Sequence, residues 1–254
     1  MTSPSRPCIA VAATLALGTG ACTAGRMDVV DLSANSLQLG MVAHWSCDQA
    51  GGSTLADSSG NGHDGAIDGA TWIDGRFGSA LHFDAGNSVT VPSFPQATRS
   101  FSVALWFRAP VGDFDDSYLA VIGNENPSTG GWEMSVRLNA SDLAYRFGYP
   151  LGGDAGTTYE HCQTDHVDLN RWVHLAAVVD ADSMRLTLFK DSVLVGDSDL
   201  GGPIEPGNSD LLLGRWSTDG RVLVGDVDDI VVFNRALVAA EVALLYARPA
   251  PTPN

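Results

Sequence analysis

The sequence predicts an all-β protein, a two-sheet antiparallel β-sandwich with one short C-terminal helix. From about residue 41 onward, short runs of alternating apolar and polar residues are separated by clusters of Gly, Asn, Asp and Ser. Such clusters form turns between strands. No internal repeat of about 20 to 50 residues is present, and 254 residues is a usual size for one large sandwich domain.

The strand prediction follows from side-chain alternation and from runs of β-branched and aromatic residues. In two packed antiparallel sheets, each strand turns one face to the core and the other to its surroundings. The predicted strands are residues 79–83, 101–107, 118–122, 132–138, 143–149, 172–179, 184–189, 211–213 and 227–233.

One segment, Ala236–Tyr246, has a helical pattern. Val238, Val242 and Leu245 are spaced to form one apolar face, which we expect to cover the sandwich. Residues 248–254 contain three prolines, which cannot continue a helix, and are predicted to be disordered.

The N-terminus has the layout of an export signal over residues 1–22: Arg6, an apolar stretch and small residues before Cys22. This ending resembles a bacterial lipobox, with Thr19 where Leu is usual, and predicts lipidation of Cys22. The alternatives are ordinary cleavage or a free Cys22. Residues 23–40 are predicted to be a flexible tether and 41–247 the domain. We therefore expect an exported protein, lipid-anchored to a bacterial membrane or cell surface, or otherwise secreted.

The two remaining cysteines of the mature chain are Cys47 and Cys162. An oxidising compartment favours a disulfide between them. Two separate buried thiols are the alternative.

Charge argues against a nucleic-acid partner. The chain has 30 acidic and 14 basic residues, a formal net charge of −16. A phosphate backbone would be repelled.

Eight motifs, in their order and spacing, resemble a laminin-G-like jelly-roll domain of the concanavalin A-like lectin/glucanase superfamily over residues 41–247. That resemblance implies a lectin-like sandwich, hence a non-catalytic recognition module displayed outside the cytoplasm. The motifs are Trp45–Asp48, Leu55–Gly65, Gly75–Asp84, Val89–Pro92, Phe101–Phe107, Arg171–Ala176, Leu186–Phe189 and Gly225–Leu237 followed by Glu241.

Three positions depart from the family pattern. Lys190–Ser192 replaces the usual Asn-Gly or Asp-Gly hairpin turn, and Asp229 stands where Glu is usual. Val238 replaces the Ser that usually caps the final helix, which leaves Glu241 with half a capping box. None of these changes is expected to break the fold.

Domains of this family often hold a structural calcium ion, a hard cation that prefers carboxylate and carbonyl oxygens. The resemblance places its ligands at Asp48, Asp84 and Asp228, with Asn61 or Asp64 as a further oxygen donor. No EF-hand spacing is present. The alternative is that these acids cap turns or pair with arginines such as Arg76 and Arg235.

Carbohydrate recognition requires aromatic faces flanked by planar polar side chains. Trp132, Tyr149, Tyr159 and Trp216 lie in or beside turns and are the candidate sugar-binding residues, with core packing as the alternative. The other tryptophans fall inside strand-like patterns and are predicted to be core residues: Trp45, Trp72, Trp106 and Trp172.

Catalytic signatures are absent from the sequence. Hydrolysis of a glycosidic bond needs two carboxylates, and the Glu-x-Asp-x-x-Glu motif of glucanases does not occur. A nucleophile elbow and a His-Glu-x-x-His helix are also missing. His161–His166 lacks the spacing of a metal helix, so zinc binding is not expected there.

The expected function is non-catalytic carbohydrate binding with a structural calcium ion. A protein-adhesion or structural surface domain is the alternative, and a glycoside hydrolase is the third reading. The expected partners are a glycan or an extracellular protein, with a membrane contacted only through a lipid anchor.

Overall fold

The computed structural model describes residues 34–111, 117–126, 129–139, 142–150, 159–208, 210–216 and 221–248. The predicted export signal, lipidation of Cys22, the first part of the tether and nearly all of the C-terminal tail lie outside these ranges. Among the described helices, none has the length and apolar character needed to cross a membrane.

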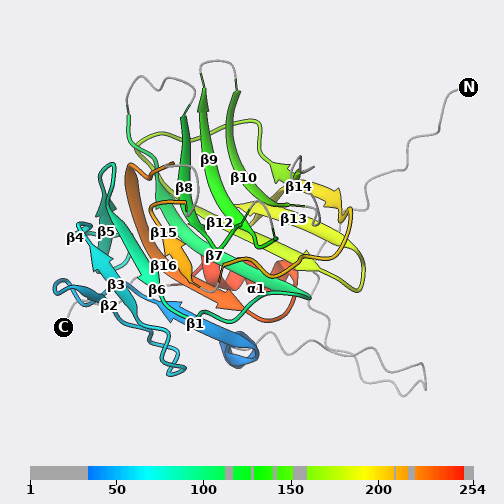
Figure 1. The fold of residues 1–254 in the computed structure, drawn as a ribbon, viewed down its shortest axis with the longest axis horizontal. Helices are drawn as coiled ribbons and strands as arrows, with labels where there is room; N and C mark the ends of the chain where they lie inside the picture. Colours follow the sequence, from blue (N-terminus) through cyan, green and yellow to red (C-terminus); the bar gives the residue numbers. More distant parts are fainter. Residues whose placement is uncertain are drawn as a thin grey trace, which may run out of the picture. The chain divides into compact units, whose positions relative to one another are not determined.

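Two antiparallel sheets form the fold, as predicted, and within the described residues each has eight strands (Figure 1). All pairings between named strands are antiparallel. Sheet A has the order β14-β13-β12-β7-β16-β5-β4, with β1 also beside β16, and sheet B has the order β11-β10-β9-β8-β15-β6-β3-β2.

Sheet A consists of β1 (Met41–Trp45), β4 (Thr71–Asp74), β5 (Ser79–Phe83), β7 (Phe101–Arg108), β12 (Trp172–Asp180), β13 (Arg185–Lys190), β14 (Val193–Asp199) and β16 (Gly225–Phe233). Sheet B consists of β2 (Thr54–Leu55), β3 (Gly65–Asp68), β6 (Ser88–Val91), β8 (Ser117–Gly123), β9 (Glu133–Asn139), β10 (Asp142–Pro150), β11 (Tyr159–Gln163) and β15 (Leu211–Leu213).

The main core lies between the sheets and follows the alternation of side chains along each strand. Leu105 and Phe107 of β7 and Val136 and Leu138 of β9 are all fully buried in it. Trp45 and Trp106 are buried as predicted, whereas Trp72 and Trp172 are only partly buried.

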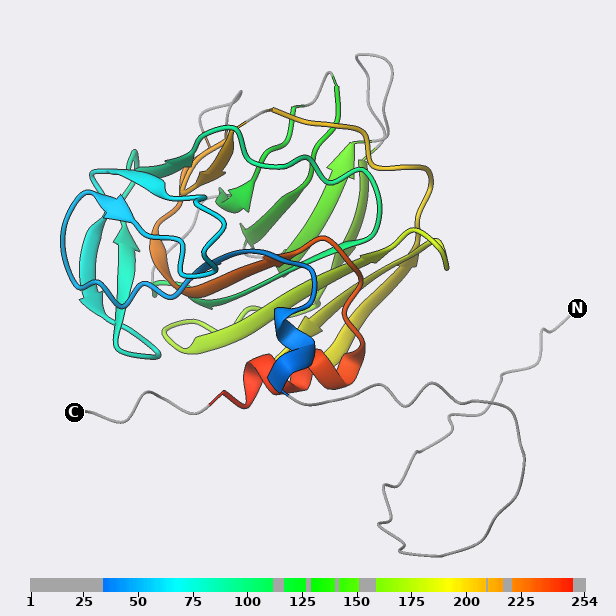
Figure 2. The same cartoon turned by 90° about the horizontal axis from the view of Figure 1, so that it is seen from below.

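A second apolar layer covers the outer face of sheet A (Figure 2). It is formed by α1 (Ala239–Tyr246) and the 3-10 helix η1 (Ala34–Gln38). Val242 of α1 packs in one cluster with Phe233 and Ala176 of the sheet, and Leu37 of η1 joins this cluster. Only sheet B therefore keeps its outer face clear of helices in the described part of the chain.

The helix begins three residues later than predicted because Val238 has extended backbone, with φ −81° and ψ 155°. As expected, only half a capping box is formed: a carboxylate oxygen of Glu241 accepts the backbone N–H of Val238 at 3.1 Å. The prediction that the whole of 23–40 is a tether is wrong at its end, since η1 belongs to the domain. Arg235 donates to the carbonyls of Leu39 (2.7 Å) and Ser36 (2.8 Å) and holds this segment in place.

The hairpin between β13 and β14 explains how the Lys190–Ser192 departure is tolerated. Asp191 and Ser192 have φ values of 50° and 65°, in the region that Asn-Gly turns usually occupy. The carboxylate of Asp191 accepts hydrogen bonds from Arg171 (2.7 Å) and from the backbone of His174 (3.0 Å). These contacts offset the strain of left-handed backbone in residues other than glycine.

The disulfide predicted between Cys47 and Cys162 is wrong: both are buried free thiols. Cys47 lies beside Asp228 of β16, whereas the sulfur of Cys162 approaches Gly196 of β14. Four strand spacings of sheet A separate β14 from β16, roughly 19 Å, whereas a disulfide requires Cα atoms roughly 4.4 to 6.8 Å apart.

We predict that Glu241→Gln destabilises the domain by about 2 to 3 kcal/mol, because it leaves Arg235 without its ionic partner. The carboxylate is 3% exposed and accepts two 2.8 Å hydrogen bonds from that guanidinium. Urea unfolding measures the change. Glu205→Gln, at an exposed glutamate, is the control, and equal loss in both variants would contradict the assigned role.

Candidate functional site

Two of the four predicted sugar-binding aromatics lie in the core. Trp132 is 1% exposed and Tyr149 is fully buried, so the prediction that they contact a sugar is wrong. Trp132 packs against Phe101 and Phe147, with ring centroids 5.4 and 5.8 Å away. The side chain of Tyr159 lies outside the described residues.

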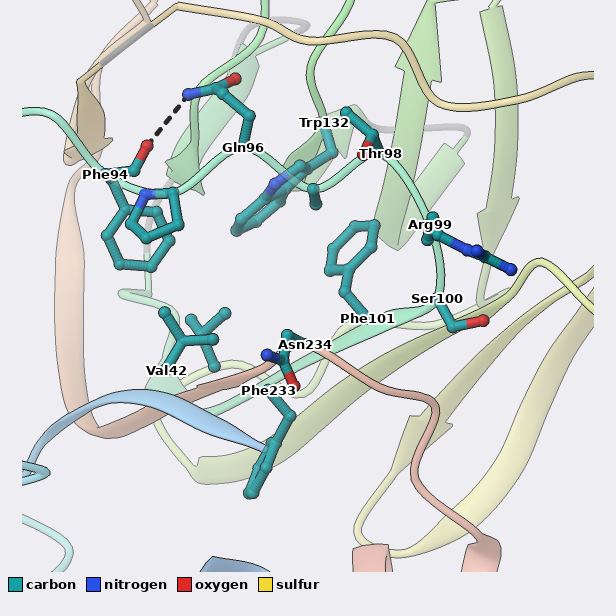
Figure 3. Close-up of a pocket in the computed structure, with 13 residues that line it drawn as sticks. Val42, Phe94, Gln96, Thr98, Arg99, Ser100, Phe101, Trp132, Phe233 and Asn234 are labelled. Atoms are coloured by element: carbon teal, nitrogen blue, oxygen red, sulfur yellow. Dashed lines mark hydrogen bonds between the residues drawn. The ribbon is translucent and has the colours of Figure 1, made fainter. Parts of the chain in front are cut away.

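Trp132 borders a cavity of about 220 Å³ at the edge of the core (Figure 3). Phe94, Phe101 and Phe233 also line it, with Gln96 at one side. Its walls are mainly apolar and its volume is below the roughly 300 Å³ of ordinary ligand pockets. We therefore interpret it as a packing cavity.

The most distinctive polar cluster lies on the outer face of sheet B. Met134 and Val136 of β9 and Phe147 of β10 are fully buried in the core. Alternation then turns Glu133 and Arg137 of β9, Arg146 of β10 and Tyr118 of β8 to the opposite face. The antiparallel register places Tyr118 directly across from Arg137. We call this surface, with Glu125, Trp216 and Arg221 described below, the open face.

Three guanidinium groups surround the ring of Tyr118. Their central carbons lie 5.2 Å (Arg137), 5.4 Å (Arg146) and 4.8 Å (Arg221) from its centroid, within the range of cation–π attraction. Arg146 also donates to the Tyr118 hydroxyl at 3.0 Å. The half-buried tyrosine thus orients the arginines of two adjacent strands and of a third segment.

That third segment follows β15, the neighbour of β8 in sheet B. The backbone N–H of Trp216 donates to the carbonyl of Arg221 at 3.0 Å, and Arg215 forms a bridge with Val222. The guanidinium of Arg221 lies 4.1 Å from the ring centroid of Trp216. Of the three predicted sugar-binding residues whose side chains are described, Trp216 is the one that lies on the open face.

Two carboxyl groups complete the open face. Glu133 is 6% exposed, Glu125 is 8% exposed, and their side chains are hydrogen-bonded to one another. Burial, reinforced by the hydrogen bond with and charge of Glu125, raises the pKa of Glu133 well above its usual value. The charges of Arg221 and Arg146 oppose this shift. The protonated form of Glu133 is therefore favoured more than in an exposed glutamate.

Such a pair is unsuited to glycosidic hydrolysis. The two carboxyl groups of a glycosidase stand roughly 5 to 9.5 Å apart, with the sugar between them. A hydrogen bond between Glu125 and Glu133 leaves no room for a glycosidic bond. The Glu125–Glu133 pair therefore lacks the spacing of a glycosidase carboxyl pair.

Donor groups remain available on this face. The Nε atom of Arg146 and the indole N–H of Trp216 are buried and have no hydrogen-bond partner in the described part of the chain. Buried donors are nearly always paired in native proteins. Each of these two N–H groups is able to donate to an oxygen atom of a ligand or of water.

Asp48 and Asp228, two of the predicted calcium ligands, flank the turn at Gly75–Ser79. Asp228 is fully buried: its Oδ2 accepts the N–H of Phe77 at 2.9 Å, and its Oδ1 has no hydrogen-bond partner within the described residues. A Cβ on Gly78 would stand 2.0 Å from the Oδ1 of Asp48. Burial raises the pKa of Asp228 to about 7. An orphaned buried carboxylate oxygen fits a cation at this turn.

The third predicted calcium ligand, Asp84, does not reach the same turn. It follows the far end of β5, roughly 16 Å from Ser79 along the strand. Asn61 donates to the carbonyls of Met41 and Val42, and Asp64 accepts the backbone N–H of Asp57. The described residues contain no cluster of three His, Cys, Asp or Glu suited to a metal ion. The prediction that Asp48, Asp84 and Asp228 together hold one ion is therefore wrong.

The potential metal ligands of the His161–His166 segment are not brought together in the described residues. Cys162 is buried in the core, whereas its neighbour His161 is exposed on the opposite face of β11. His166 is exposed and lies 3.8 Å from Asp168. Alternation of β11 directs the potential ligands to different sides of the sheet.

A second polar cluster lies on the outer face of sheet A, in a hollow of about 590 Å³. Asp226 contacts His82 through one carboxylate oxygen and Arg108 through the other, both at 2.6 Å. Arg108 also lies over the ring of Trp172. Since these charged groups satisfy one another, this cluster is a weaker candidate than the open face.

We predict that Glu133→Gln removes a pH-dependent loss of stability. The pKa of Glu133 in the folded protein lies above its unfolded value, so the folded state binds the extra proton. Stability is therefore lost as pH rises above about 4.3. Glutamine resembles the protonated acid and lacks this loss. Unfolding between about pH 5 and 9 should show the stability of Glu133→Gln relative to wild type increasing with pH. Parallel curves would contradict the raised pKa of Glu133, and Glu205→Gln is the control.

Comparisons with known proteins identify the superfamily to which this fold belongs. The Laminin_G_3 profile, described as the concanavalin A-like lectin/glucanases superfamily, matches residues 83–243, more than half of the chain. A search of curated proteins returned no match.

Solved structures of low sequence identity share the fold. The binding domain of Paraclostridial Mosquitocidal Protein 1 is 18% identical, with a TM-score of 0.67 over 83% of this chain and 52% of that chain. Domain 4 of a GH43 extracellular arabinanase from Geobacillus stearothermophilus, in complex with arabinotriose, is 19% identical, with a TM-score of 0.64 over 81% and 98%.

The botulinum neurotoxin serotype D ligand-binding domain, in complex with N-acetylneuraminic acid, is 13% identical, with a TM-score of 0.61 over 82% and 50%. The chain thus spans about half the length of these toxin domains and nearly all of the arabinanase domain. Its two-sheet architecture and the profile match agree: the chain belongs to the concanavalin A-like lectin/glucanases superfamily.

Proposed function

We propose that this protein is a non-catalytic carbohydrate-binding module whose ligand occupies the open face of sheet B. The cluster around Tyr118 is the observation that carries the proposal. It combines aromatic rings, three guanidinium groups and a carboxyl pair on one face of a rigid sheet. Planar polar groups beside aromatic surface are what sugar hydroxyls and C–H faces require.

The hydrogen-bonded contact between Glu125 and Glu133 supports binding over hydrolysis, for the reason of spacing given above. The arabinanase domain, which was solved with arabinotriose, offers an analogy for glycan binding by this fold. We further propose that the domain acts outside the cytoplasm, in keeping with the export signal expected in residues 1–22.

We predict that Trp216→Ala weakens glycan binding by about tenfold, equivalent to roughly 1.4 kcal/mol, because it removes aromatic surface and the support of Arg221. A glycan array identifies ligands and calorimetry measures the affinity. Trp172→Ala, a half-buried tryptophan on sheet A, should bind like wild type. Silence of the folded wild-type protein across neutral and acidic glycans would contradict the proposal.

We also propose a structural calcium ion at the Gly75–Ser79 turn, held by Asp48 and Asp228 together with backbone carbonyl groups. A calcium ion would supply a positively charged partner for the buried carboxylate of Asp228. Its role would be to fix the turn that leads into β5, since neither aspartate belongs to the open face.

For calcium we predict a rise of the wild-type melting midpoint, which a chelator reverses. Binding at about 100 times Kd would add about 2.7 kcal/mol of stability. Asp228→Asn should lose the response, whereas Asp84→Asn should keep it because Asp84 lies at the other end of β5. A wild-type midpoint indifferent to calcium, or loss of the response in Asp84→Asn, would refute this site.

Protein adhesion is the second candidate function, favoured by one observation. The edge strand β14 exposes three consecutive apolar residues, Val193 (62%), Leu194 (50%) and Val195 (36%). Exposed apolar edges pair readily with other chains. If Val193→Lys abolishes attachment to a partner surface while the open-face variant Trp216→Ala does not, adhesion through β14 is the better description.

A further inference from the structure

A row of polar side chains crosses three strands on the outer face of sheet A. Leu81 and Phe83 of β5 are buried in the core, so alternation turns His82 to the outer face. In register, His82 lies opposite Asp226 of β16, and Asp226 lies opposite Arg108 of β7. The pairing of these strands thus brings the three side chains together in the hollow described above.

Asp226 holds the ring of His82 in one orientation. One carboxylate oxygen accepts the Nε–H of Arg108 and the other lies against Nδ1 of His82, both at 2.6 Å. Arg108 is held in turn by the ring of Trp172, whose centroid is 4.8 Å from the guanidinium carbon. Because an ionised carboxylate only accepts hydrogen bonds, Nδ1 of His82 carries a proton. In the neutral ring, the lone pair that binds a metal ion then belongs to Nε2.

That Nε2 atom faces the carboxylate of Asp84, which follows β5. Its distance to Oδ1 of Asp84 is 3.5 Å, and the two side chains are 35% and 78% exposed. Imidazole nitrogen and carboxylate oxygen bind zinc at roughly 2.0 to 2.2 Å, so an ion bound to both atoms would subtend an angle of roughly 110 to 120°. This angle is close to tetrahedral without movement of either side chain.

The contacts behind His82 are those of a metal ligand. A histidine that binds a metal ion usually donates its other ring N–H to a carboxylate, which fixes the ring and raises its basicity. Asp226 is placed to do this. An imidazole nitrogen favours transition ions such as zinc over calcium, which prefers oxygen ligands. The formal net charge of −16 also favours cations over anions at the surface.

We infer that His82 and Asp84 form a binding site for a divalent transition-metal ion such as Zn²⁺, with Asp226 as the positioning residue. Two protein ligands leave the remaining coordination positions to water, in keeping with the lack of a three-residue cluster among the described residues. The affinity is therefore expected to be modest. This site lies at the opposite end of β5 from the calcium turn and is independent of glycan binding.

The test is a titration of the full-length protein with ZnCl₂, followed by the NMR signals of the histidine rings. The His82 signals are assigned by their absence from the His82→Gln variant, so zinc bound elsewhere on the chain does not obscure the result. We expect these signals to shift in a saturable way with zinc and to stay in place with CaCl₂. His166, an exposed histidine 3.8 Å from Asp168, is the matched control: His166→Gln should leave the His82 response unchanged.

Two carboxylate variants separate the ligand from the positioning residue. Asp84→Asn should weaken zinc binding at His82 by about tenfold or more, with the ring unchanged in the absence of metal. Asp226→Asn should weaken it by about 10- to 100-fold. The ring ¹⁵N signals of Asp226→Asn should also indicate a mixture of tautomers before zinc is added, an effect that a purely structural role of Asp226 would not produce. Melting curves verify that each variant is folded.

His82 signals that do not move in excess zinc would overturn the inference and leave His82 and Asp84 as a plain ion pair. Equal zinc affinity at His82 in wild type and Asp84→Asn would also overturn it, because Asp84 would then not be a ligand. A saturable shift that is weakened in both carboxylate variants would support the site. None of these outcomes bears on glycan binding by the open face.

Discussion

The two-residue period of β-strands is the constraint on which both the core and the open face depend. In β9, burial of Met134 and Val136 in the core forces Glu133 and Arg137 outward, and in β10 burial of Phe147 does the same for Arg146. A register slip of one residue would bury the arginines and expose the apolar side chains. The free energy of core burial therefore positions the polar cluster, which needs no separate scaffold.

The two sheets use their outer faces differently because only one of them is covered. Over sheet A, α1 and η1 supply apolar residues such as Val242 and Leu37, and Arg235 ties both segments together through Glu241 and the carbonyl of Ser36. No described helix covers sheet B. Its outer face is instead filled by charged and aromatic side chains, which are only partly shielded from water and remain suited to a ligand.

Strand alternation and turn residues were sufficient to predict most of the long strands and the single helix, but short strands such as β2 and β3 lack enough residues to show a period. The same alternation, applied further, would have excluded Trp132 and Tyr149 from sugar binding. Trp132 has the parity of Met134, and Tyr149 that of Phe147, so both face the core. By contrast, Arg221 meets Tyr118 only because β15 pairs with β8. A contact between residues about a hundred positions apart cannot be predicted from the sequence without knowledge of this strand pairing.

The separation of Glu125 and Glu133 limits the chemistry that this carboxyl pair can perform. Gly123 at the end of β8 lies opposite Glu133 in register, and Glu125 follows two residues later. Opposed positions on neighbouring strands have Cβ atoms roughly 4.5 to 5.5 Å apart, so two carboxyl side chains at this location meet instead of facing each other across a sugar. The same strand pairing places this carboxyl pair within the electrostatic reach of Arg146 and Arg221.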